Sequence, residues 1–180
     1  MRQLVLLIVA VLVGGCSGVF SVAPVGTQPK NIEATQGEWQ GTWMHPDGAL
    51  MVRVIDASFG ELEIGWVDEG GGALKYERVT MVLRDAGDWT FASFKPRGEE
   101  GEKQYAWARV RKEERQVILW RPNEDKFKAL VEEGRLPGTV DGSVVVLDTL
   151  APEHLDLIRS EKHGVLFVWD KPFVLLKAGK

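Results

Sequence analysis

The chain has 180 residues, with 22 basic and 26 acidic side chains and a formal net charge of −4 at pH 7. This mild acidity, without a dense basic cluster, argues against nucleic acid as a partner, because phosphates are bound through grouped lysine and arginine. The length suits one domain that buries a sizeable core, and a single cysteine excludes an internal disulfide.

The first seventeen residues, MRQLVLLIVAVLVGGCS, predict an export signal. Arg2 supplies a short positive start, and an apolar run extends from Leu4 to Val13. At about 1.5 Å per residue, this run covers roughly half of a bilayer core of about 30 Å, so a permanent transmembrane helix is not expected. The run leads into Val13-Gly14-Gly15-Cys16, which resembles the lipobox of bacterial lipoproteins.

The lipobox resemblance implies a signal peptide over residues 1–15 and a lipidated Cys16. In that family a diacylglyceryl group joins the cysteine sulfur, and a third acyl chain such as palmitate usually joins its amine. Several chains on one residue anchor a protein to the membrane permanently, since each buried methylene contributes about 0.8 kcal/mol. By analogy with the sorting of Gram-negative lipoproteins, Ser17 in place of an aspartate favours the outer membrane, with the protein facing the periplasm. The alternative is an ordinary cysteine beside an ordinary cleavage site.

Residues 16–36 are rich in Ser, Gly, Pro and Thr and have no sustained period. This composition predicts a flexible tether between the lipid on Cys16 and a single β-rich domain over residues 37–180. The other possibility is that the apolar side chains of this segment dock on the domain; these are Val19, Phe20, Val22 and Val25.

From Gly37 onwards, short segments rich in Val, Ile, Trp and Phe alternate with turn clusters, which is typical of antiparallel strands. Strands are expected at residues 38–45, 49–56, 60–68, 73–84, 88–95, 103–110 and 115–121. Leu62, Ile64 and Trp66 alternate with glutamate and glycine, so this strand is expected to bury one face. Several other strands offer apolar groups to both faces, which predicts a sheet closed around a core and partly covered outside.

Two helices are expected to supply that cover. Asn123 suits the N-cap of a helix ending at Gly134, and Pro152 suits the first turn of a helix ending at Gly164. Residues 143–147 predict a buried strand, and residues 165–169 with 173–177 predict a final hairpin. The predicted fold is mainly β: an antiparallel meander of about ten strands closing into a barrel-like or sandwich domain, with two short helices in the C-terminal half.

Seven tryptophans are spread nearly one per predicted strand. Most are expected to fill the core, and some are candidates to line an apolar ligand pocket, namely Trp39, Trp43, Trp66 and Trp107. Gly37-Glu38-Trp39 and Gly41-Thr42-Trp43 resemble the Gly-x-Trp opening of lipocalins and other small ligand-binding barrels, in which the ring plugs one end. The resemblance implies a barrel-like architecture. The later lipocalin motifs, including an arginine over the tryptophan, are not evident, so it implies no ligand.

The sequence contains few residues in patterns typical of catalytic sites, and an enzyme is not expected. The histidines, His45, His154 and His163, do not pair at metal-ligand spacing, and no Gly-x-Ser-x-Gly elbow exists. Glu61 and Glu63 share a strand face, but a solvated surface explains them better than acid–base work does. The acidic loop 99–102 lacks the oxygen spacing of a calcium site. No metal site or cofactor is predicted.

The sequence therefore predicts a non-catalytic envelope lipoprotein whose domain is an interaction module in the periplasm. Contacts with another envelope component would use strand edges or apolar residues of the helices and the final hairpin, Phe167, Trp169 and Phe173. The alternative is a lipocalin-like carrier whose barrel holds a small apolar molecule near the candidate tryptophans. The two hypotheses differ in whether the barrel interior is filled.

Overall fold

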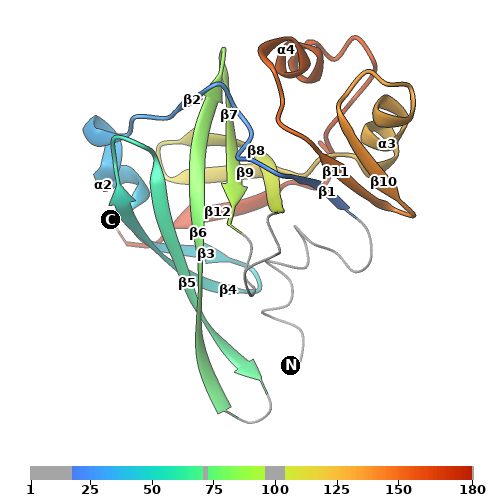
Figure 1. Ribbon diagram of the computed structural model, residues 1–180. Coiled ribbons are helices and arrows are strands. Elements are labelled where there is room, and N and C mark those ends of the chain that lie inside the picture. The colour runs from blue at the N-terminus through green and yellow to red at the C-terminus, as the bar shows by residue number, and fades with distance from the viewer. Residues whose placement is uncertain (1–17, 71–72, 96–103, 180) are drawn as a thin grey trace.

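A closed antiparallel barrel of eight strands dominates the computed structural model, which describes residues 18–70, 73–95 and 104–179 (Figure 1). The barrel strands are β3 (Gly41–His45), β4 (Gly48–Asp56), β5 (Glu61–Gly70), β6 (Ala73–Ala86), β7 (Trp89–Phe94), β8 (Tyr105–Glu113), β9 (Gln116–Trp120) and β12 (Phe173–Lys177). Strands β3 to β9 form a meander in which each pairs with the next. β12 closes the barrel by pairing with both β3 and β9. The predicted mainly β fold with an antiparallel meander is confirmed.

Side-chain alternation separates a buried inner face of the barrel from an outer face. On β5, Leu62, Ile64 and Trp66 are buried in the inner core, whereas Glu61 and Glu63, which alternate with them, are only half-buried. Each of the other barrel strands also contributes to this inner core. Burial of one such large apolar side chain stabilises the fold by about 1.5–3 kcal/mol, so the interior is the main source of barrel stability.

The turn between β4 and β5 requires glycine at position 60. Gly60 has φ +64°, and a Cβ added there would lie 2.6 Å from the Lys30 carbonyl oxygen. The carbonyl of Gly60 accepts a hydrogen bond of 2.9 Å from the Leu83 amide. The residue thus combines a left-handed backbone with close approach to two other segments, and both demands exclude a side chain.

A second layer covers one side of the barrel, where Figure 1 shows the helices beside a short strand group. It comprises β1 (Gly18–Ser21), α3 (Glu124–Glu132), β10 (Gly138–Asp141), β11 (Val144–Leu147) and α4 (Pro152–Ser160). β1 joins this layer to the barrel, because it pairs in parallel with β11 and antiparallel with β8. Both helices bury apolar residues in an outer core against the barrel wall; these are Phe127, Leu130, Leu155 and Ile158.

The ends of the helices follow the expected capping chemistry. The Asn123 side chain accepts a hydrogen bond from the Lys126 amide, and Gly134, just beyond α3, has φ +68°. Pro152 opens α4, but this helix ends at Ser160 because Glu161, with φ +50°, takes the left-handed conformation expected of Gly164. In the described part of the chain, no helix combines the length and apolar character needed to cross a membrane.

The segment expected to be a tether packs on the body from residue 18 onwards. It contains β1, β2 (Gln28–Pro29), the 3-10 helix η1 (Glu33–Thr35) and the short helix α2 (Gln36–Trp39). Val19, Val25 and Ile32 are buried, so the structure has the docked arrangement that was the alternative to a flexible tether. Burial of these side chains and the β1 ladder offset the entropy of ordering the segment. Residues 1–17, which include the lipobox and Cys16, lie outside the described residues.

Two predicted strands differ in the structure. The strand expected over residues 38–45 begins only at Gly41, whose φ of +125° separates it from α2. The hairpin predicted over residues 165–169 and 173–177 does not form: Phe167 makes only an isolated bridge to Pro122, while β12 pairs with β3 and β9. Leu166 and Phe167 are nonetheless fully buried, so their apolar character reflects the outer core and not a strand.

Candidate functional site

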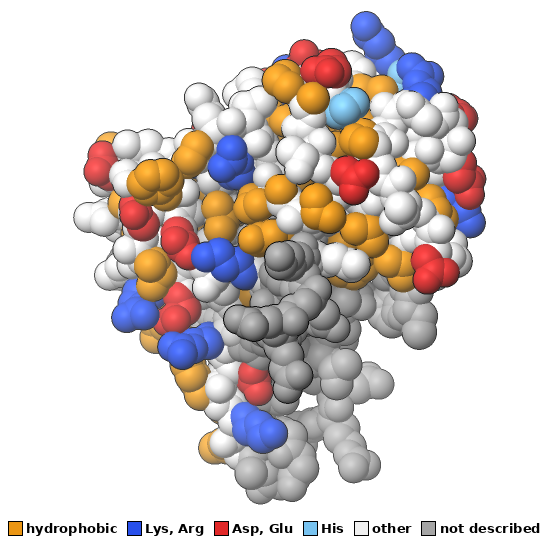
Figure 2. Space-filling model, in the orientation of Figure 1, with side chains coloured by type: hydrophobic (Ala, Val, Ile, Leu, Met, Phe, Trp, Pro, Cys, Tyr) orange, Lys and Arg blue, Asp and Glu red, His pale blue; other side chains and the backbone are white. Residues whose placement is uncertain are grey.

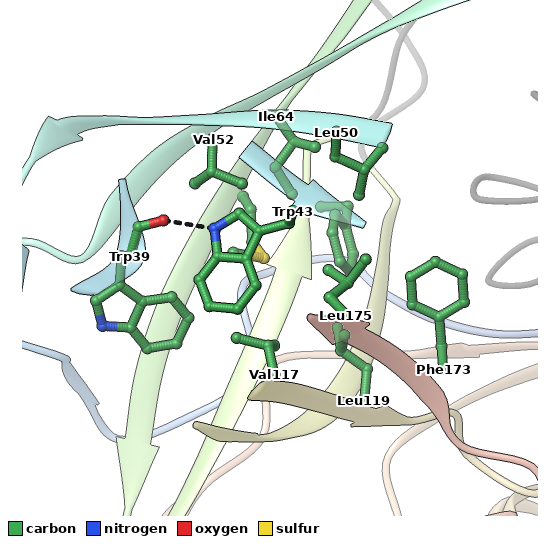
Figure 3. Close-up of a pocket in the computed structure, with 11 residues that line it drawn as sticks. Trp39, Trp43, Leu50, Val52, Ile64, Val117, Leu119, Phe173 and Leu175 are labelled. Carbon is green, nitrogen blue, oxygen red and sulfur yellow. Dashed lines mark hydrogen bonds between the residues drawn. The ribbon is translucent and has the colours of Figure 1, made fainter. Parts of the chain in front are cut away.

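The barrel interior contains an apolar cavity of about 30 Å³ (Figure 3). Trp39 of α2 and Trp43 of β3 form part of its wall, and the Trp43 indole donates a hydrogen bond of 2.8 Å to the Trp39 carbonyl. The rest of the lining is Leu50, Val52, Ile64, Met81, Phe94, Val117, Leu119, Phe173 and Leu175. This lining would present no polar group to a ligand.

The cavity is too small for a lipocalin-type ligand. Sites for small molecules commonly occupy about 300–1,000 Å³, whereas one water needs at least about 10–15 Å³ of such space. A volume of about 30 Å³ therefore has room for about two waters at most, and the apolar wall would not hold them. The inward side chains largely fill the barrel by packing against one another.

The four candidate tryptophans do not line one space. Trp39 and Trp43 border the cavity, and Trp66 is buried in the same inner core without lining it. Trp107 lies on the opposite face of β8, in the outer core, where its ring meets Phe127 edge-on at 5.4 Å. The structure thus brings together two of the four residues.

Two lysines flank the Trp43 ring at the end of the barrel closed by α2. The Nζ atoms of Lys112 and Lys177 lie 5.9 and 5.7 Å from the ring centre. Lys177 donates to the carbonyl of Glu38 at 2.9 Å, which ties β12 to α2. Burial, and next the charge of Lys112, lower the pKa of Lys177. These two cations lie over the Trp43 ring, a feature that no linear motif indicated.

Large apolar side chains are exposed on the outside of the barrel, on β3, β4, β5, β6 and β12. We call this surface the outer apolar face; its residues are Met44, Met51, Val67, Leu74, Tyr76 and Leu176, which are 45–70% exposed. Leu176 stands opposite Met44, Val67 stands opposite Tyr76, and Met51 stands opposite Gly65. A side chain at Gly65 would meet the Tyr76 hydroxyl at 2.1 Å, so the tyrosine extends across this glycine toward the adjoining strand.

The outer apolar face continues onto a protruding part of the β5–β6 hairpin, at the lower end of Figure 1. β4 pairs with β5 only as far as Gly65, and the described ladder of β7 with β6 ends at Met81, beyond which the Lys95 amide donates to the Thr80 carbonyl. In the described ladders, the hairpin beyond these points is therefore a two-stranded ribbon with unpaired edges. Figure 2 shows hydrophobic side chains among charged ones over this hairpin. Such ribbons and edges are suited to adding a partner's surface or strand.

The residues of the predicted final hairpin that were expected to contact a partner protein are not exposed at the surface. Phe167 is fully buried, Phe173 is 9% exposed and Trp169 packs against the outer core. The apolar surface available to a partner lies instead on the barrel strands named above. Met44, Met51 and Leu176 each adjoin a buried residue on the same strand, and this alternation is the one sequence signal that could have located them.

The polar residues considered for catalysis have structural partners. His45 stacks on Phe173 with ring centres 4.1 Å apart, and His154 accepts a hydrogen bond from the Ala151 amide. Glu61 pairs with Lys95, and Glu63 lies between two arginines, Arg53 and Arg78. Within residues 18–70, 73–95 and 104–179, no group of three or more His, Cys, Asp or Glu side chains is arranged to hold a metal ion. The acidic loop 99–102 lies outside these residues.

Comparisons with protein-family models, with curated proteins and with solved structures find no match to this chain. The fold itself defines the class: a small closed antiparallel β-barrel, consistent with the lipocalin-like architecture that the two Gly-x-Trp sequences imply. Within that class, the filled interior and the exposed outer face are the features that bear on function.

Proposed function

We propose that this protein is a lipid-anchored component of the bacterial envelope that acts by binding another envelope protein through its outer apolar face. The observation that carries the proposal is the contrast between the two faces of the barrel. The interior leaves about 30 Å³ free, whereas the six large apolar side chains of the outer apolar face are 45–70% exposed. Apolar groups gathered on the surface of a folded protein are a frequent mark of an interaction site.

The lipid anchor belongs to the proposal because of the lipobox sequence ending at Cys16. The ladder of β1 starts at Gly18, two positions after this cysteine. At about 3.3–3.6 Å per residue, two residues reach about 7 Å at most, so lipid on Cys16 would hold the barrel close to the bilayer. The proposed location is the periplasmic side, on the outer membrane, where a partner would lie in or beside the same membrane.

The partner is a protein that presents its own apolar side chains, and the edges of the β5–β6 ribbon, which are unpaired in the described ladders, would add backbone hydrogen bonds to a strand from it. Methionine suits such a surface because its flexible side chain adapts to different shapes, and two of the six exposed residues are methionines, Met44 and Met51. The small interior volume supports this non-catalytic binding role over the carrier alternative.

The anchor is tested by replacing Cys16 with alanine and fractionating cells. Wild-type protein is expected in the outer-membrane fraction, and Cys16→Ala protein is expected in the soluble or inner-membrane fractions. An alanine variant that remains in the outer membrane at the wild-type level would refute lipidation as the anchor.

The binding surface is tested by a photoreactive amino acid placed at Tyr76 in cells. We expect a discrete high-mass adduct at Tyr76 and none at Lys126, an exposed position on α3 that serves as control. A second substitution, Met51→Glu, should abolish the Tyr76 adduct, while Lys126→Glu should leave it. Equal adducts at both positions, or insensitivity to Met51→Glu, would contradict a specific outer apolar face.

A further inference from the structure

Arg109 on β8 lies among three tryptophans on the outside of the barrel. Its guanidinium carbon is 3.9 Å from the ring centre of Trp89, 4.6 Å from that of Trp169 and 5.4 Å from that of Trp120. Trp169 also meets Trp120 edge-on at 5.0 Å, so the rings support one another. Each close cation–π contact stabilises the charge by about 0.5–2 kcal/mol, and together they hold the side chain in one orientation.

The indole rings present their faces to Arg109, and these faces offer its N–H groups no oxygen acceptor. A guanidinium has five N–H donors, and burial in proteins normally provides carboxylates or carbonyls for them. Among the described residues, the Arg109 guanidinium has no carboxylate within 4 Å and no side-chain hydrogen bond. Burial lowers its pKa, while Glu161 and Asp88 favour the charged form from a greater distance. The arginine is therefore oriented, yet its side-chain donors have no acceptor among the residues that the structure describes.

A cleft of about 320 Å³ adjoins this arginine, between β8, α2 and the turn joining β6 to β7. Lys30, Arg111 and Lys112 also line the cleft, but each has a carboxylate partner: Asp85 for Lys30, Glu113 for Arg111 and Glu38 for Lys112. Asp88 is the acidic residue in the wall, and it lies 3.8 Å from Arg159. Among the described residues of the cleft wall, Arg109 is thus the cation without a carboxylate partner.

We infer that this cleft is a binding site for an oxyanion, a phosphate or carboxylate group of a small ligand, with Arg109 as the residue that receives it. The planar fork of arginine matches two oxygens of such a group at once, and Arg109 lines the cleft beside Trp89. Arg111 lies two positions along the same strand face and is paired with Glu113. The site is independent of the lipid anchor and of the outer apolar face.

The test is a titration of ¹⁵N-labelled full chain, in nonionic detergent, with inorganic phosphate and separately with acetate, against sodium chloride of equal ionic strength. The readout is the set of indole N–H signals, one for each of the seven tryptophans. We expect saturable shifts confined to Trp89, Trp120 and Trp169 with one or both oxyanions, and the tighter of the two identifies the preferred group. Shifts that do not saturate, or that chloride reproduces, would overturn the inference.

Two variants make the assignment specific. Arg109→Gln should weaken binding at least about tenfold, and Arg109→Lys should weaken it less, because lysine retains the charge but loses the two-point geometry. Arg53→Gln is the matched control, since Arg53 is an exposed arginine on the outer face of β4 and should bind as the wild type does. Should Arg109→Gln not fold, the lysine variant decides: undiminished affinity in either folded variant would refute the role of Arg109.

Discussion

The filled barrel interior predicts a large stability difference between two leucines on neighbouring parts of the wall. Leu50 on β4 is 2% exposed and borders the 30 Å³ cavity, whereas Leu176 on β12 is 55% exposed on the outer face. Leu→Ala in a close-packed core costs roughly 2.7–5.0 kcal/mol. Because Leu50 already faces a small void on one side, we expect Leu50→Ala to cost about 3 kcal/mol, near the lower end of that range.

The exposed leucine provides the matched control, because Leu176→Ala removes the same atoms from a wet surface and should change stability by no more than about 0.5 kcal/mol. Urea denaturation of both variants checks the prediction. With a slope of about 2 kcal/mol per M, Leu50→Ala should lower the midpoint by about 1.5 M at an unchanged slope. A loss below about 1 kcal/mol for Leu50→Ala, or equal losses for the two variants, would refute the packed interior.

Three further predictions concern local contacts. Trp43→Phe removes the indole donor to the Trp39 carbonyl and should cost about 2 kcal/mol in urea denaturation; no measurable loss would mean that this bond is unimportant. Asn123→Ala removes the cap of α3 and should cost about 1 kcal/mol in the same assay, whereas Asn123→Asp should be close to wild type. Hydrogen bonds from the Ser58 side chain and the Phe59 amide lower the pKa of Asp56 below 3.8, so its stabilising effect is present above about pH 4 and lost as the pH falls through the lowered value. Asp56→Asn should therefore reduce the loss of stability on acidification below pH 4, and an NMR titration should give a pKa below 3.8 for Asp56; a value at or above 3.8 would contradict the hydrogen-bonded turn.

Local sequence patterns predicted most of the barrel strands. The alternation around Leu62 and Ile64 identified an amphipathic strand, and the capping residues Asn123 and Gly134 bounded α3, because both signals depend on neighbours within a few residues. The strand predicted over residues 165–169 is wrong, since a short apolar run has the same sequence whether it pairs in a sheet or fills a core.

Long-range partners could not be predicted. β1 is held by a parallel ladder to β11, more than a hundred residues away, and nothing within its Gly-Val-Phe-Ser sequence indicates that pairing. Trp107 is among the predicted pocket residues with Trp39 and Trp43, but its side chain lies on the outer face of the barrel wall. Both faces of β8 carry apolar residues, so the sequence does not show which face points into the barrel. The Arg109 cage is likewise assembled from three separated segments and has no linear motif.

The central claim is that the barrel interior is packed and that the protein binds through its outer apolar face. Its most direct test is mass spectrometry of the wild-type protein extracted from bacterial membranes, first under native and then under denaturing conditions. A packed interior predicts the same mass in both, equal to the processed polypeptide plus any covalent lipid at Cys16. A small apolar molecule that accompanies the native protein and departs on denaturation would contradict the account and make the barrel a carrier.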